Sequence, residues 1–180
     1  MPLLRAPGND KIGRRNEKML YSELKKYGVT TPLGDKVGKA VDVVVHIKDW
    51  NIKEVDVSPG LFKKAIWYDF DAVKNVDDNK KKVVIEGEAH SASKPTTGDI
   101  SINDLMRKKI FSSDEKEIGK MYDAVIATKP EYWKMEKVLI HHGTSKRRLR
   151  LSSSEIKSVT DKIVLSKTYE EVEGIKEESK

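Results

Sequence analysis

The sequence predicts a mainly β protein made of two tandem small antiparallel β-barrels, each with a short helical turn, paired by pseudo-two-fold symmetry. Three observations support this fold class. The segments rich in β-branched residues are short and are separated by turns. No helical pattern of about 10–15 residues separates them, so a parallel α/β sheet is disfavoured. Finally, the two halves of the chain resemble each other.

The internal repeat extends over most of the chain. Five residues of the first half recur 81 positions later in the second half: Leu24, Gly38, Lys39, Asp42 and Val44 match Leu105, Gly119, Lys120, Asp123 and Val125. After a two-residue insertion the offset becomes 83, and Trp50 matches Trp133. A repeat of this length indicates that both halves share one topology.

The elements follow the same order in each half. The apolar residues of segments 17–28 and 102–109 have helical spacing, which predicts a short helical turn at the start of each half. A long strand is expected next, at 37–47 and at 117–127, directly after the turn-like tetrapeptides LGDK and SDEK. Further strands are expected at 52–57, 65–70 and 81–87 in the first half, and at 134–140, 147–151 and 162–166 in the second.

Composition divides the chain into five parts. Residues 1–16 are predicted to be a flexible arm, 17–89 the first barrel, 90–99 a linker, 100–168 the second barrel and 169–180 an acidic tail. The chain has 180 residues, of which 37% are hydrophobic, so its core must be compact or divided. It has no cysteine, no segment of signal-peptide character and no long apolar run, so we expect a cytoplasmic protein.

The residues shared by the two halves are interpreted as structural. Glycine in a strand often permits a close backbone approach, which predicts this role for Gly38 and Gly119. The lysines that follow them, Lys39 and Lys120, belong to the same motif. Asp42 and Asp123 are expected to be hydrogen-bonded strand aspartates, and Trp50 and Trp133 to be packing residues.

Both faces of the segment 41–47 carry apolar side chains, unlike a half-buried strand. We therefore expect this strand to be buried against the other half as well as against its own barrel. Segments 41–47 and 122–128 should then lie near each other around the pseudo-two-fold axis.

Two surfaces are candidates for partner binding. Four basic residues within five positions predict a charged ridge: Lys146, Arg147, Arg148 and Arg150. Trp67 and Tyr68 are the candidate exposed aromatic pair. The net charge is +6, but the segment after Tyr169 is rich in Glu. We expect this tail to cover the ridge as a salt-sensitive mask whose removal leaves the fold intact.

No catalytic, cofactor or metal site is predicted. The sequence has neither GxGxxG nor GxxxxGK, and its four histidines, His46, His90, His141 and His142, lack the HxxxH and HExxH spacings. The serine run at 152–154 has no base near it in sequence that could activate a hydroxyl. We therefore expect a protein that is not an enzyme.

The order of motifs resembles the PRC-barrel domain. In the second half the resemblance covers residues 102–167, through DLMRKKIFSSDEKEIGKMYDAVIA, KVLI and LRLSSSEIKSVTDKIVLS, and the first half resembles the domain more loosely. The tandem arrangement is similar to that of archaeal PRC-barrel proteins of the cell-division machinery. PRC-barrel domains also occur in the photosynthetic reaction-centre H subunit and in the ribosome maturation factor RimM.

The resemblance implies a non-enzymatic adaptor that binds partner proteins, among them division proteins of the SepF or FtsZ type. It implies no catalytic residue and no membrane insertion. Because single-domain relatives tend to form dimers, it also implies a monomeric pseudo-dimer or a homo-oligomer. The alternative is an RNA- or ribosome-associated factor that uses the basic clusters.

Overall fold

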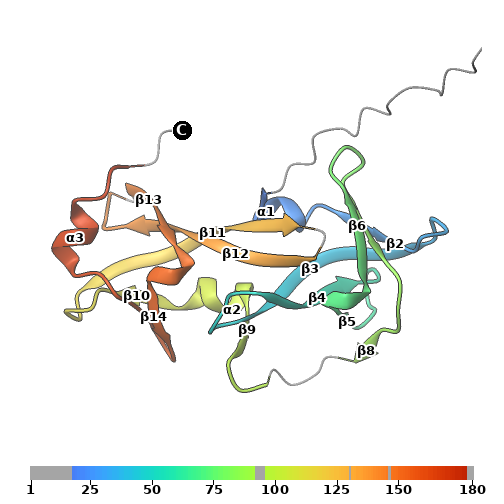
Figure 1. The fold of residues 1–180 in the computed structure, drawn as a ribbon, viewed down its shortest axis with the longest axis horizontal. Helices are drawn as coiled ribbons and strands as arrows, with labels where there is room; N and C mark the ends of the chain where they lie inside the picture. The colour runs from blue at the N-terminus through green and yellow to red at the C-terminus, as the bar shows by residue number, and fades with distance from the viewer. Residues whose placement is uncertain (1–17, 92–95, 130, 146, 178–180) are drawn as a thin grey trace, which may run out of the picture.

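The structure is a computed structural model of the 180-residue chain, and it describes residues 18–91, 96–129, 131–145 and 147–177. Its strands form two curled sheets that lie side by side, one for each half of the sequence (Figure 1). This arrangement confirms the mainly β fold class and the two tandem barrels.

The first half forms an eight-stranded sheet with the order β6-β7-β2-β3-β4-β5-β8, in which β9 also pairs with β3. Its own elements are β2 (Gly28–Thr30), β3 (Lys36–His46), β4 (Ile52–Ser58), β5 (Ile66–Asp69), the 3-10 turn η1 (Phe70–Ala72), β6 (Val73–Asp77), β7 (Lys82–Ile85) and β8 (His90–Ser91). β5 and β6 lie far apart in this order, yet only η1 separates them in sequence. The sheet must therefore curl, which closes the barrel.

The second half repeats this plan in a seven-stranded sheet with the order β13-β12-β11-β10-β15-β14, in which β1 also pairs with β11. Its own elements are β10 (Lys109–Phe111), β11 (Glu117–Lys129), β12 (Tyr132–His142), β13 (Arg147–Ser152), the 3-10 turn η2 (Ser153–Glu155), β14 (Ile156–Val159) and β15 (Ile163–Leu165). Most pairs in both sheets are antiparallel. One parallel pair in each sheet, β2 with β7 and β10 with β15, departs from the all-antiparallel expectation.

The two halves exchange their first elements. The strand β1 (Lys18–Leu20) and the helix α1 (Tyr21–Leu24) begin the first half, but β1 pairs with β11 of the second half. The strand β9 (Asp99–Ser101) and the helix α2 (Ile102–Arg107) begin the second half, and β9 pairs with β3 of the first. The registers correspond: Met19 lies opposite Ile126, and Ile100 lies opposite Val45, each 81 positions away from its counterpart. This reciprocal exchange gives the pairing its pseudo-two-fold symmetry.

The repeat aspartates anchor the exchanged helices. Asp42 on β3 accepts hydrogen bonds from the Tyr21 hydroxyl (2.7 Å) and from the backbone N–H of Asn103 on α2 (3.3 Å). Asp123 on β11 accepts from the backbone N–H of Ser22 on α1 (3.0 Å) and from its hydroxyl (2.6 Å). Each aspartate therefore holds the first helix of the other half, at equivalent positions in the repeat.

One continuous core cluster contains buried residues of both halves. Val43 and Val45 belong to it, whereas Val44 is buried on the other face of β3, opposite Ser101 of the exchanged strand β9. The two-sided apolar pattern of this segment is thus explained by the other half. The elements of the second half that contact β3 are β9, which pairs with it, and α2. The sequence pattern had instead predicted the segment 122–128 of β11 in this place.

Gly38 and Gly119 allow neighbouring strands to approach closely. A Cβ atom on Gly38 would overlap the backbone oxygen of Ser58, and one on Gly119 would overlap that of His141. Gly119 also has a φ of 149°, which disfavours other residues. This is the structural role that the sequence predicted for both glycines.

The segment predicted as a linker is partly ordered into strands. β8 pairs with β5, and β9 pairs with β3. Residues 92–98 separate these two strands, and of them 92–95 lie outside the described residues. The predicted arm at 1–16 also lies outside the described residues.

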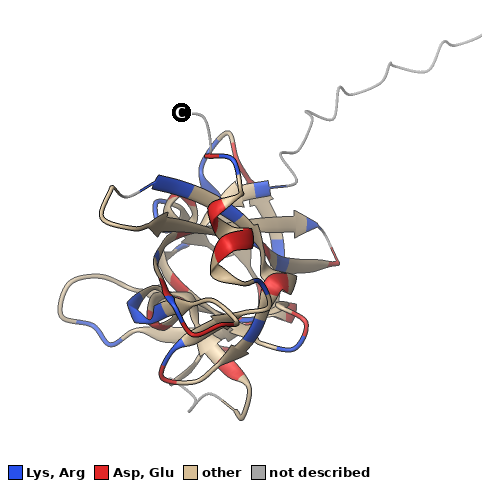
Figure 2. Cartoon of the chain, turned by 90° about the vertical axis from the view of Figure 1, so that its left-hand side faces the viewer, with Lys and Arg blue, Asp and Glu red and all other residues tan. Residues whose placement is uncertain are grey.

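The segment predicted as an acidic tail contains a docked helix, α3 (Tyr169–Glu173). The Thr168 hydroxyl caps its first turn by accepting from the backbone N–H of Glu171, and Val172 is fully buried. The buried ring of His142 lies between the backbone oxygen of Ile118 (2.7 Å from Nδ1) and a Glu173 carboxylate oxygen (2.6 Å from Nε2). The prediction of a removable mask is therefore wrong for 169–173, because this segment completes the core. Figure 2 shows α3 at the end of the second half, with its acidic residues among basic ones.

Candidate functional site

The junction between the halves is built around two equivalent tryptophans. Trp50 and Trp133 are both buried, as their interpretation as packing residues requires. The backbone oxygen of Trp50 accepts from the N–H of Met135 (2.9 Å), and Asn51 forms an isolated bridge with Lys134. Asn51 and Lys134 are themselves 83 positions apart, so this bridge joins equivalent residues. The Trp133 ring also contacts Phe70 of the first half, with ring centroids 5.7 Å apart.

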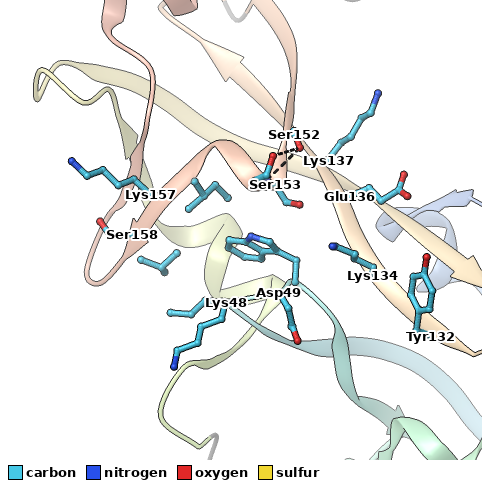
Figure 3. Close-up of a pocket in the computed structure, with 15 residues that line it drawn as sticks. Lys48, Asp49, Tyr132, Lys134, Glu136, Lys137, Ser152, Ser153, Lys157 and Ser158 are labelled. Carbon is cyan, nitrogen blue, oxygen red and sulfur yellow. Dashed lines mark hydrogen bonds between the residues drawn. The ribbon is translucent and has the colours of Figure 1, made fainter.

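A groove of about 820 Å³ lies beside this junction, and we call it the cationic groove. Both halves line it: Ile47, Lys48, Asp49 and Trp50 from the first, and Tyr132, Lys134, Glu136, Lys137, Ser152, Ser153, Ser154, Ile156, Lys157, Ser158 and Val159 from the second. Figure 3 shows Lys48, Lys134 and Lys157 along the edges of this space, with Ser152 and Ser153 at its upper side and the ammonium ends of Lys48 and Lys157 directed outward. The lining of the groove contains four lysines and two acidic residues.

One of the two acidic residues is already paired. A Glu136 carboxylate oxygen lies 2.6 Å from the Lys18 Nζ, on the exchanged strand β1. Asp49 accepts a hydrogen bond from the backbone N–H of Asn51 (3.0 Å). The groove therefore keeps an excess of positive charge, together with hydroxyl groups and the exposed ring of Tyr132.

A second groove, of about 650 Å³, borders the same junction through Asn51 and Tyr132, and we call it the anionic groove. Its lining contains four carboxylates, one lysine and one histidine: Glu54, Asp69, Asp71, Asp99, Lys53 and His46. His46 Nδ1 lies 2.7 Å from an Asp99 carboxylate oxygen, and the Thr96 hydroxyl donates to the other oxygen of Asp99. Tyr132 lines both grooves.

The two grooves are related by the repeat but differ in charge. At the offset of 83, Lys137 of the cationic groove corresponds to Glu54 of the anionic groove, and Ser152 corresponds to Asp69. Both pairs lie cross-strand, Lys137 opposite Ser152 and Glu54 opposite Asp69. The backbone scaffold has been kept while the side chains have diverged.

The predicted ridge lies elsewhere, on β13. Arg147 is half-buried and donates to the backbone oxygens of Val172 (3.4 Å) and Glu173 (3.2 Å), so α3 occupies it. Arg148 is half-buried and Arg150 is exposed, and neither lines either groove. Lys146 lies outside the described residues.

The predicted aromatic pair is divided between the two faces of β5. Tyr68 is 8% exposed and belongs to the core, so it is not a surface residue as predicted. Alternation along the strand leaves Trp67 half-buried on the other face, opposite Asp56 and His90. The repeat lysines Lys39 and Lys120 are both exposed.

Sequence reasoning missed both grooves. Lys48 and Lys157 are 109 positions apart and come from different halves, so no local motif joins them. The signal that the sequence offered was the alignment of the two halves. In this alignment, charged residues of one half are matched by residues of different charge in the other half.

Comparison with known protein families identifies one match. Residues 16–89 match the PRC-barrel domain. This segment contains the strands β1 to β7. The match falls on the first half, which the motifs predicted to be the looser of the two copies. No curated protein matches the chain. Within the described residues, no helix is both long and apolar enough to span a membrane.

Proposed function

We propose that this chain, whose residues 16–89 match the PRC-barrel domain, is a non-enzymatic adaptor that binds an acidic segment of a partner protein in the cationic groove. The single observation that supports the proposal is the groove itself. It lies between the two halves, and its lining contains four lysines and two carboxylates, Glu136 and Asp49. Glu136 forms an ion pair with Lys18, which lies outside the groove lining.

The chemistry of the lining suits an extended acidic peptide. Lysine side chains attract carboxylates and raise the rate of encounter with an acidic partner. Tyr132, which is 38% exposed, offers apolar surface of the kind that is enriched in protein interfaces. The hydroxyl groups of Ser154 and Ser158 can bond to peptide backbone between the charged contacts.

A finer proposal concerns the identity of the partner. The resemblance of the tandem arrangement to archaeal PRC-barrel proteins supports a division protein of the SepF or FtsZ type. The alternative partner is RNA, which the exposed Arg150 and the half-buried Arg148 on β13 support.

The first experiment measures binding of a fluorescent peptide of about twelve residues, rich in Asp and Glu, and of a single-stranded RNA of similar charge. The double variant Lys48→Glu/Lys157→Glu should weaken peptide binding at least tenfold. Its control is Lys63→Glu/Lys64→Glu, which changes the net charge equally at exposed positions between β4 and β5. This control should leave the affinity within twofold. Equal losses in both variants would show that net charge alone attracts the peptide, and would contradict the proposal.

The RNA alternative has its own signature. Binding through several phosphate contacts falls steeply between about 50 and 200 mM salt. Tight, salt-sensitive RNA binding that charge reversal at Arg148 and Arg150 abolishes would favour the alternative. The finer proposal is tested by direct binding of purified SepF-type and FtsZ-type proteins to the chain and to the same two double variants.

A further inference from the structure

We propose that Glu54, Asp69 and His90 form a binding site for a divalent transition-metal ion of the zinc class on the outer face of the first barrel. One ligand atom from each of these residues lies within 4.8 Å of the other two. The three residues come from three adjacent strands, β4, β5 and β8. The inference is independent of the proposed adaptor function.

The backbone places the two carboxylates where they repel each other. Glu54 and Asp69 lie directly opposite on antiparallel strands, a position in which like charges are destabilising. The anionic groove around them is also lined by the carboxylates of Asp71 and Asp99. Its lining contains one lysine, Lys53. A bound cation would remove this repulsion.

The imidazole supplies an independent observation. The Nε2 atom of His90 is buried and has no hydrogen-bond partner, although it lies 3.5 Å from an Asp69 carboxylate oxygen. Two ligands on a tetrahedral zinc ion, each bonded at about 2.0–2.2 Å, are about 3.4 Å apart. The observed separation matches that spacing, and a metal ion would give the buried Nε2 atom a partner.

The set of donors determines the class of ion. Imidazole nitrogen favours zinc, nickel, copper and iron, whereas magnesium and calcium prefer sites made only of oxygen. Three protein ligands also leave a position open on a tetrahedral ion, as in zinc sites that bind water or a further ligand.

The second half provides an internal comparison. At the equivalent positions it carries Lys137 and Ser152, which lie opposite each other on β12 and β13. A lysine in place of the glutamate excludes a cation there. Among the described residues, the equivalent strand pair of the second half therefore lacks the two carboxylates of this site.

The test is calorimetric titration of the chelator-treated full chain with ZnCl2, and separately with MgCl2. We expect one zinc ion per chain, and at least about tenfold weaker binding in both His90→Asn and Glu54→Gln, since loss even of groups around a metal's ligands costs about 10–100-fold. The control Asp71→Asn removes a carboxylate of the same groove outside the ligand set and should stay within twofold. Circular dichroism establishes that each variant is folded.

Titration with Co²⁺ gives a second measurement, because its visible absorption reports coordination by imidazole and carboxylate. The spectrum should appear in the full chain and be lost in His90→Asn. Zinc binding that persists in both ligand variants, no zinc binding at all, or equal affinity for magnesium would each overturn the proposal.

Discussion

Asp56 lies on β4 directly opposite Asp42 on β3, so two carboxylates share a cross-strand position. Asp42 is satisfied by the Tyr21 hydroxyl, whereas one carboxylate oxygen of Asp56 is buried without a hydrogen-bond partner. Burial, reinforced by the charge of Asp42, raises the pKa of Asp56 to about 6. The second half has Leu139 at the equivalent position, opposite Asp123. The pair of acids is thus a feature of one copy only.

The raised pKa of Asp56 predicts a pH-dependent effect of Asp56→Asn. The folded chain holds a proton on Asp56 that the unfolded chain loses, so stability falls as pH rises from about 4 to about 6. Above that window, Asp56→Asn should stabilise the fold by about 1 kcal/mol, after allowance for the solvent that reaches this half-buried group. Below about pH 4 the gain should disappear. Urea unfolding at pH 4 and pH 7 checks this, and an equal gain at both values would contradict it.

The close approach at Gly38 predicts a second effect at the scale of single residues. Gly38→Ala should lower the free energy of unfolding by about 2 kcal/mol, because its Cβ would meet the backbone of Ser58. The matched control is Gly28→Ala, where an added Cβ meets nothing within 4 Å. This control should change stability by less than about 0.5 kcal/mol. Thermal and urea unfolding measure both, and similar values for the two variants would show that strand entropy, not the clash, dominates.

At the scale of elements, α3 holds the end of the chain by apolar packing as well as by charge. Val172 is fully buried, and Tyr169 and Ile175 pack against the core. The Arg147 guanidinium lies 3.4 Å from Glu173, and the His142 ring holds the pKa of Glu173 below its usual range. Both nitrogens of that ring lie within hydrogen-bond distance of oxygens, those of Ile118 and Glu173.

This packing predicts that α3 stabilises the fold at any salt concentration. Val172→Ala should cost about 2 kcal/mol, and deletion of residues 169–180 should cost more. Glu170→Ala, at an exposed position of the same helix, is the control and should be nearly neutral. Unfolding measurements at about 0.1 and 1 M NaCl distinguish apolar packing from ionic attraction, because salt screens only the latter. If the loss of stability vanished at high salt, the segment would be held by charge alone, and the docking of α3 by apolar packing would be contradicted.

At the scale of the whole molecule, neither half completes its own sheet. β1 pairs with β11, β9 pairs with β3, and Asp42 and Asp123 each bind the first helix of the other half. The two barrels therefore share structural elements as well as an interface, and we expect them to unfold as one cooperative unit.

The exchange predicts the behaviour of a divided chain. If residues 1–93 and 94–180 are produced as separate polypeptides, each alone should be largely unfolded or self-associated, because part of its sheet is missing. Mixed together, they should form a folded one-to-one complex. Light scattering and near-ultraviolet circular dichroism measure this. Two stable, folded monomers that do not associate would contradict the interlocked arrangement.

The sequence by itself determined the duplication, the order of the main elements along the chain and the structural role of the shared residues. These properties depend on local patterns: β-branched runs, turns, and glycines and aspartates that recur at a constant offset, as for Gly38 and Gly119. Periodicity along the strand segment 41–47 also showed that both of its faces are buried.

Only the tertiary structure decided which elements cover that strand, where α3 packs and which side chains share a groove. Lys48 and Lys157 meet in the cationic groove, and Glu54, Asp69 and His90 meet on three strands, without any fixed sequence spacing. Such groups are brought together by the curl of the sheets and by the exchange between halves. Both depend on long-range pairing, whose energy is not a property of any single segment.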